Sequence, residues 1–198
     1  SLRSSTFGDL NTAIGANALY AQDTADRVTA VGYEALFYNN RDYNTAIGAW
    51  AGWGNSWNSN NLSEGTENTM IGYGALTGNA YGSKNVAIGH MAMSIFSPAT
   101  FVSGSAPSRN VGVGDSALQK NRGNDNTAIG FNSLGNNTSA VGNTSLGSIS
   151  LVNHQIGNYN TAIGFESMTA DTSGSLNTAV GWRSLRNTFV GSEIQPLV

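Results

Sequence analysis

The sequence predicts an all-β protein, a parallel β-solenoid of about eleven coils. The pentapeptide NTAIG occurs four times, at 11–15, 44–48, 126–130 and 160–164. Looser copies fill the intervals, at 28–32, 68–72, 85–89, 110–114, 138–142, 177–181 and 187–191. Every copy ends in glycine, preceded by isoleucine or valine. Because the motif recurs over nearly the whole chain, it is the building unit of the fold.

The composition fits one repeat domain over 1–198, with coils over about 7–194 and an irregular C-terminal cap at 187–198. A chain with 25 glycines, 25 asparagines and only 11% charged residues could be disordered. The aliphatic residue at a fixed place in each copy argues against disorder. A net charge of −3 and the lack of basic runs argue against nucleic acid, and no apolar stretch is long enough for membrane insertion. The absence of cysteine excludes disulfides and thiol chemistry.

Positions in each copy are numbered from the motif glycine, which is position 0. Position −1 is Ile or Val in all eleven copies, and position −3 is mostly Thr or Val. Such residues favour strands, and two positions apart they share one face. We expect position −1 to be buried inside the coil. Position −2 is Ala or Gly in nine copies, so we expect this small residue near another backbone, on the axis of a homotrimer.

After the glycine, which permits a sharp bend, the pattern continues. Position +3 is Ala or Ser in ten copies and position +4 is Leu or Met in nine. We expect a second short strand here, so that about a third or more of all residues lie in strands. Asparagine recurs at position −4. It either bonds the backbone of the next coil in a ladder or is an ordinary turn residue.

The spacing between motif glycines varies from 10 to 25 residues. This variation predicts loops on one side of the solenoid. The three largest expected excursions are Trp50–Asn68, Met93–Asn110 and Gly147–Asn160.

The repeats NTAIGANAL and NTAIGFNSL resemble those in phage tail fibres and in bacterial surface fibres that mature with a self-cleaving chaperone. They are also similar to the head repeats of YadA-like trimeric autotransporter adhesins. The resemblance spans about residues 7–194. It implies a left-handed parallel β-roll with three chains per fibre, with aliphatic residues filling the roll and the small residue facing the trimer axis. This chain departs from the family in its uneven coils and its aromatic insert.

The stretch WAGWGNSWNSNN at 50–61 contains the candidate binding residues. Three tryptophans lie beside amide side chains, and aromatic faces with amides are suited to contact sugar rings. The candidate glycan-binding residues are Trp50, Trp53, Trp57, Asn55 and Asn58. Alternatively, the tryptophans cover the side of the solenoid or the seam of the trimer.

Catalysis finds little support, and we expect no catalytic residue, metal or cofactor. Glu64 and Glu67 are the alternative, as the carboxylate pair of a surface-polysaccharide depolymerase. His90 and His154 lack metal-ligand spacing. Ice binding by a flat threonine face is a further alternative, which the expected burial of position −1 and the uneven coils disfavour.

Together these features predict a non-enzymatic, extracellular, trimeric fibre segment or tip, from a phage tail fibre on a virion or from a bacterial adhesin. Its loops would bind a cell-surface glycan or another surface receptor. The remaining alternatives are a structural spacer and a depolymerase.

Overall fold

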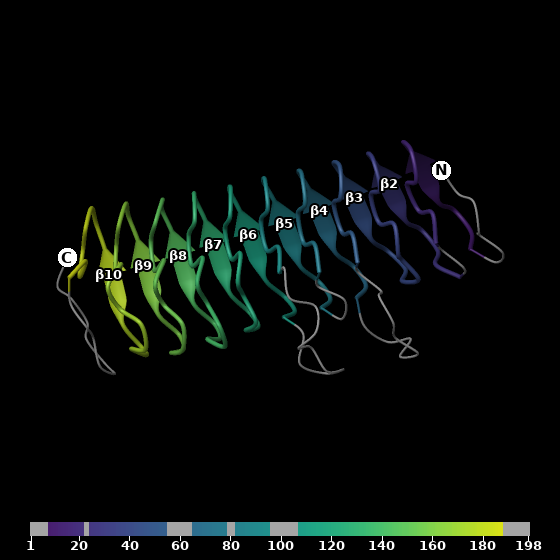
Figure 1. Ribbon diagram of the computed structural model, residues 1–198. Helices are drawn as coiled ribbons and strands as arrows, with labels where there is room; N and C mark the ends of the chain where they lie inside the picture. The colour runs from purple at the N-terminus through teal and green to yellow at the C-terminus, as the bar shows by residue number, and fades with distance from the viewer. Residues whose placement is uncertain (1–7, 22–23, 55–64, 79–81, 96–106, 188–198) are drawn as a thin grey trace.

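The structure is a computed structural model that describes residues 8–21, 24–54, 65–78, 82–95 and 107–187. Its ten strands form one parallel sheet in chain order, so that the protein is a β-solenoid as predicted. Figure 1 shows the strands as a single row, running from β1 at one end to β10 at the other. Each strand comes from one motif copy.

All ten strands are three residues long. They are β1 Thr12–Ile14, β2 Thr29–Val31, β3 Thr45–Ile47, β4 Thr69–Ile71, β5 Val86–Ile88, β6 Val111–Val113, β7 Thr127–Ile129, β8 Thr144–Leu146, β9 Thr161–Ile163 and β10 Thr178–Val180. Neighbouring strands pair with equivalent motif positions opposite each other, as in Thr12↔Thr29 and Ile14↔Val31. Columns of like side chains therefore run along the solenoid.

The prediction of a second strand in each coil is wrong. Within the described residues, the segment after each motif glycine is a run of turns. Position +4 has a left-handed backbone even where it is leucine, as at Leu36 (φ 49°) and Leu118 (φ 53°). Strand content is accordingly well below the expected third, because only one side of each coil is extended.

The motif glycines stack directly on one another. A Cβ atom on Gly32 would lie 2.5 Å from the carbonyl oxygen of Gly48, and one on Gly48 would lie 2.5 Å from that of Gly72. The φ angles of these glycines, from 126° to 139°, are strained for residues with a side chain. Glycine is therefore required at this corner by both space and backbone angle.

The predicted orientation of the strand is also wrong. Position −2 faces the inside of the chain's own coil, and Ala30, Ala46 and Ala128 are fully buried. Position −1 faces outward, where Ile14 is 60% and Ile129 is 40% exposed. The small residue at −2 therefore packs within its own coil and not on a trimer axis.

The core lies between position −2 on the strand side and positions +3 and +4 on the turn side. Its largest members are the buried residues Leu19, Leu36, Met70, Leu76, Met93, Leu118, Leu134, Leu151 and Met168. A coil this narrow encloses one large side chain at +4, so the opposite wall must be small. Met70, the larger residue at −2, is accommodated beside Gly52, which has no side chain.

The asparagine ladder is confirmed. The Oδ1 atom of each −4 asparagine accepts the backbone N–H of the −4 residue in the next coil. Asn68 donates to Asn44 at 2.9 Å, Asn85 to Asn68 at 2.9 Å and Asn110 to Asn85 at 2.9 Å. These side chains are buried. The ladder satisfies backbone donors that the corner would otherwise leave unpaired.

A second buried polar column stands at position +7. It contains Asn39, Asn121, Asn137, His154 and Asp171. Asn137 donates from Nδ2 to Asn121 Oδ1 at 2.6 Å, and two coils later His154 Nδ1 lies 3.0 Å from Asp171 Oδ2. One histidine–aspartate pair thus replaces the asparagine pair inside the solenoid.

The eighth repeat was assigned to the wrong glycine. Its strand is β8, from the pentapeptide NTSLG at 143–147, and Ala128 pairs with Ser145. The copy at 138–142 forms no strand, and the expected excursion Gly147–Asn160 belongs to a coil of ordinary length. Long intervals remain only from Gly48 to Gly72, 24 residues, and from Gly89 to Gly114, 25 residues. The expected eleventh copy and most of the cap lie outside the described residues.

Candidate functional site

Aromatic residues gather on the turn side of the first five coils. Four rings from successive coils form an aromatic strip: Tyr33, Trp50, Tyr73 and His90. Ring centroids are 6.3 Å apart from Tyr33 to Trp50, 5.2 Å from Trp50 to Tyr73 and 5.4 Å from Tyr73 to His90. Trp50 is 40% exposed and Tyr73 is 42% exposed. The strip therefore presents ring surface to solvent along the solenoid axis.

A second chain of ring contacts runs beside the strip. It joins Tyr20 to Phe37 at 4.9 Å, Phe37 to Tyr38 at 4.6 Å and Tyr38 to Trp53 at 5.9 Å. These contacts hold the Trp53 ring against its neighbours on the same side of the molecule. The strip comes from positions +1 and +2 and this second chain from positions +5 and +6, so together they form two aromatic walls.

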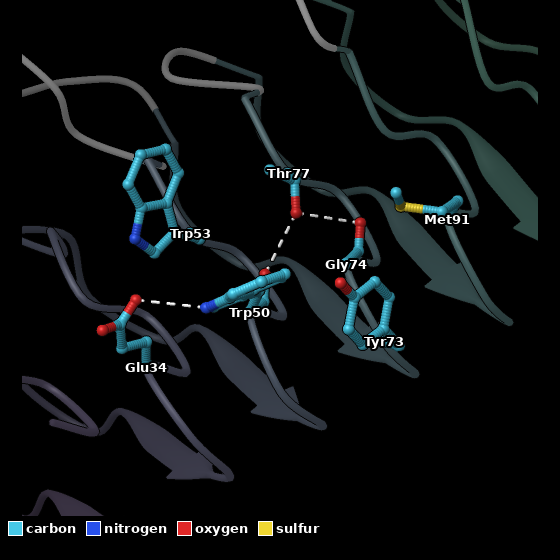
Figure 2. Close-up of a pocket in the computed structure, with 7 residues that line it drawn as sticks. All are labelled: Glu34, Trp50, Trp53, Tyr73, Gly74, Thr77 and Met91. Carbon is cyan, nitrogen blue, oxygen red and sulfur yellow. Dashed lines mark hydrogen bonds between the residues drawn. The ribbon is translucent and has the colours of Figure 1, made fainter. Parts of the chain in front are cut away.

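Between the walls lies a hollow of about 340 Å³, which we call the Gly74 hollow. It is lined by Glu34, Trp50, Trp53, Tyr73, Gly74, Thr77 and Met91, as Figure 2 shows. The volume lies within the range of small-molecule sites. Its lining is mostly apolar, with the carboxylate of Glu34 on one side and the hydroxyl of Thr77 on another.

The hollow has a simple origin in the repeat. Position +2 is Glu34, Trp50, Gly74 and Met91 in four successive coils. The glycine omits one side chain from this column, between the indole of Trp50 and the thioether of Met91. A Cβ atom on Gly74 would lie 2.6 Å from the Met91 sulfur. A gap of one residue in an otherwise filled column therefore creates the site.

Internal hydrogen bonds fix the walls. Trp50 Nε1 donates to Glu34 Oε2 at 3.1 Å, and Thr77 Oγ1 lies 3.0 Å from the carbonyl oxygen of Trp50 and 2.9 Å from that of Gly74. The dashed lines of Figure 2 mark these contacts. Hydrogen bonding to Glu34, together with its negative charge, raises the pKa of the Tyr33 phenol. The Glu34 carboxylate thus lies close to two rings of the strip.

The structure brings together two of the five predicted site residues. Trp50 and Trp53 line the hollow, whereas Trp57, Asn55 and Asn58 lie outside the described residues. The sequence analysis missed Glu34, Gly74, Thr77 and Met91, and Tyr73 was recognisable only as one of the aromatic residues that recur at position +1. Aligning coils by motif position would have found the four, because Glu34, Gly74 and Met91 share position +2 with Trp50, and Thr77 shares position +5 with Trp53.

The alternative chemistries receive no geometric support. Glu64 lies outside the described residues, and Glu67 is exposed and does not line the hollow. Among the described residues, no group of three or more His, Cys, Asp or Glu side chains could hold a metal ion. The part of the chain that the structure describes has no helix long and apolar enough to cross a membrane.

No protein-family model matches this chain, and no curated protein or solved structure is significantly similar to it. The case for a function therefore rests on the geometry of the solenoid and its aromatic side.

Proposed function

We propose that this chain is a non-enzymatic segment or tip of an extracellular trimeric fibre, from a phage tail fibre or a bacterial adhesive fibre, and that it binds a cell-surface glycan. The aromatic strip beside the Gly74 hollow is the observation that carries this proposal. Its half-exposed rings offer faces for the C–H groups of sugars, on coils that fix the spacing of the rings. Because few charges are involved, binding should depend weakly on salt.

A glycan array compares the wild type with Trp50→Ala/Tyr73→Ala and with Phe131→Ala. Phe131 is a matched control, because it is an exposed ring at the same +1 position as Tyr73 but in a distant coil. We expect the double variant to lose binding and the control to keep it. Retained binding in the double variant contradicts the proposed site.

Two other outcomes identify the rival functions. A wild type that binds no glycan and no cell surface is a structural spacer. Release of reducing ends from a surface polysaccharide, abolished by Glu64→Gln or Glu67→Gln, identifies a depolymerase instead.

The trimer is supported by the outward face of the sheet. Positions −3 and −1 of the ten strands present threonine and aliphatic side chains in continuous columns. The exposed aliphatic residues of this face are Ile14, Ile47, Ile71, Ile129, Leu146 and Val180. Uncovered apolar surface of this extent is typical of protein–protein interfaces. The proposed contact between chains is thus this Thr/Ile face, in place of the buried alanine column.

Light scattering tests this assembly. We expect a particle of three times the 20.6 kDa chain mass, reduced to one chain by Ile47→Arg/Ile129→Arg and unchanged by Ser139→Arg on an exposed turn. A wild-type particle of one chain mass refutes the trimer.

The same face favours one second candidate. Threonine and isoleucine columns at regular spacing could order water. Because these residues face outward, ice binding is a second candidate function. The two roles exclude each other, since a face buried in a trimer cannot contact ice. A monomer that slows ice recrystallisation, with the activity lost in Thr45→Leu/Thr127→Leu, would support ice binding over the fibre.

A further inference from the structure

The polar atoms of the Gly74 hollow are largely occupied by one another. The Trp50 N–H bonds to Glu34, and the Thr77 hydroxyl lies within hydrogen-bond distance of two backbone carbonyls. The other walls are aromatic rings, a thioether and the Gly74 backbone. The Glu34 carboxylate has acceptor sites left for one donor, so a primary ammonium buried there, with three donors, would leave the others unpaired. The hollow therefore favours a chemical group that donates no hydrogen bond.

The charge at the hollow is negative. Glu34 accepts a hydrogen bond from a neutral indole, and no lysine, arginine or histidine of the described residues forms an ion pair with it. Faces of aromatic rings carry negative electrostatic potential as well. A carboxylate among three aromatic rings attracts a cation, and aromatic surroundings favour weakly hydrated organic cations.

We propose that the Gly74 hollow binds a quaternary trimethylammonium group, as in a choline substituent on a surface glycan. Such a group combines a positive charge with methyl surfaces and has no hydrogen to donate. The aromatic strip would contact the attached sugar while the hollow takes the cationic group. This inference rests on the proposed surface-binding function, which it makes more specific.

Titration with choline, followed by tryptophan fluorescence and calorimetry, tests the proposal directly. The neutral isostere 3,3-dimethyl-1-butanol and the primary amine ethanolamine serve as matched probes. We expect choline to bind about tenfold more tightly than either, within the range of cation–aromatic attraction. Glu34→Gln should weaken choline binding about fivefold or more, because it removes the charge. Glu67→Gln, the same change at an exposed position away from the hollow, should have no effect.

One variant fills the hollow while keeping the fold. Asn17 and Asn132 occupy position +2 with φ angles of 56° and 50°, close to the 61° of Gly74. Gly74→Asn therefore places a side chain in the gap at a backbone angle that asparagine tolerates, and the flexible Met91 thioether must move aside. We expect this variant to lose choline binding while its circular dichroism spectrum still matches that of the folded wild type.

Equal affinity for choline and its neutral isostere, or choline binding retained by folded Gly74→Asn, overturns the inference. If choline fails to bind but glycans bind in a Trp50-dependent way, the surface-binding function stands and the trimethylammonium inference falls. If the wild type binds neither choline nor any glycan, both fall.

Discussion

The buried pair His154–Asp171 provides a sharp test of how the solenoid is held together. Side-chain exposure is 0% for His154 and 2% for Asp171. His154 Nδ1 lies 3.0 Å from Asp171 Oδ2, and Nε2 lies 2.9 Å from the carbonyl oxygen of Gly157. The side-chain amide of Asn160 also lies near this ring, with its Nδ2 atom 3.3 Å from Nε2. We predict that Asp171→Asn removes the buried carboxylate that holds the His154 ring through Nδ1.

The expected loss in the free energy of unfolding is large. A hydrogen bond to a charged group contributes about 1.5–3 kcal/mol, against about 5–15 kcal/mol of stability for a typical domain. Replacing both residues should cost much less, because His154→Asn/Asp171→Asn recreates the pair Asn121–Asn137 found at position +7. Denaturant unfolding of the single and double variants measures the difference.

The pair also makes the protein sensitive to acid. Burial by itself raises the pKa of Asp171, but hydrogen bonds from His154 and the Gly174 backbone N–H outweigh it, so the net pKa is lowered from 3.8. The folded state thus binds this proton more weakly than the unfolded state. The resulting stabilisation is full above about pH 4 and is lost as the pH falls through the lowered pKa.

The double asparagine variant lacks this loss. It should therefore gain stability relative to the wild type as the pH falls below about 4. Two results would refute the reasoning: a double variant as unstable as Asp171→Asn at neutral pH, or equal dependence of stability on pH in acid for the wild type and the double variant.

Three further predictions concern the columns of the repeat. Gly130→Ala should destabilise strongly, since its Cβ would lie 2.6 Å from the next coil's backbone, whereas Gly181→Ala, with a similar φ and no described residue within 4 Å, should cost only the backbone strain of about 1–3 kcal/mol; thermal melts separate the two, and equal losses would contradict the stacking argument. Asn126→Ala leaves the buried backbone N–H of Asn143 without its acceptor and should cost about 1–3 kcal/mol in urea unfolding; a loss no larger than that of exposed Asn153→Ala would argue against the ladder. Ala128→Arg should unfold the chain, because Ala128 is fully buried; a folded monomer detected by circular dichroism and light scattering would show instead that this column faces another chain.

The class of fold could be predicted because the repeat leaves few options. Eleven short copies with β-branched residues before a glycine require stacked parallel strands, since no single coil has a core of its own. The glycine corner followed from the same recurrence, because it requires one residue type at one position. The recurring asparagine was equally visible, but the sequence left the ladder and an ordinary turn residue as alternatives.

The orientation of the strand could not be predicted in the same way. Alternation assigns positions −1 and −3 to one face and −2 to the other, but it does not say which face is inside. Hydrophobicity alone would place isoleucine inside the coil and the smaller alanine near its surface. The deciding fact is the narrow coil, in which the +4 side chain, such as Leu118, already fills the interior.

The prediction of the eighth repeat was wrong for a different reason. Two consecutive copies end at Gly142 and Gly147, and the first is the better match at positions −2 and −1. Only the flanking positions separate them, because Gly147 alone has asparagine at −4, Asn143, whose N–H bonds to Asn126. A spacing of 17 residues on both sides agrees with this choice.

The candidate site was predicted only in part. Trp50 and Trp53 were conspicuous as tryptophans. The feature that makes a hollow is a missing side chain at Gly74, which becomes apparent only when three coils are placed in register.

The two long intervals between motif glycines have a consequence for how such a protein can change over evolution. Both insertions enter at the same corner, after position +6, and the glycine column resumes its contacts on the far side, as between Gly48 and Gly72. Added length there alters neither the paired strands nor the asparagine ladder. That corner can therefore acquire, exchange or lose whole segments while the rod keeps its register. The same corner is a natural place to graft a foreign peptide for display.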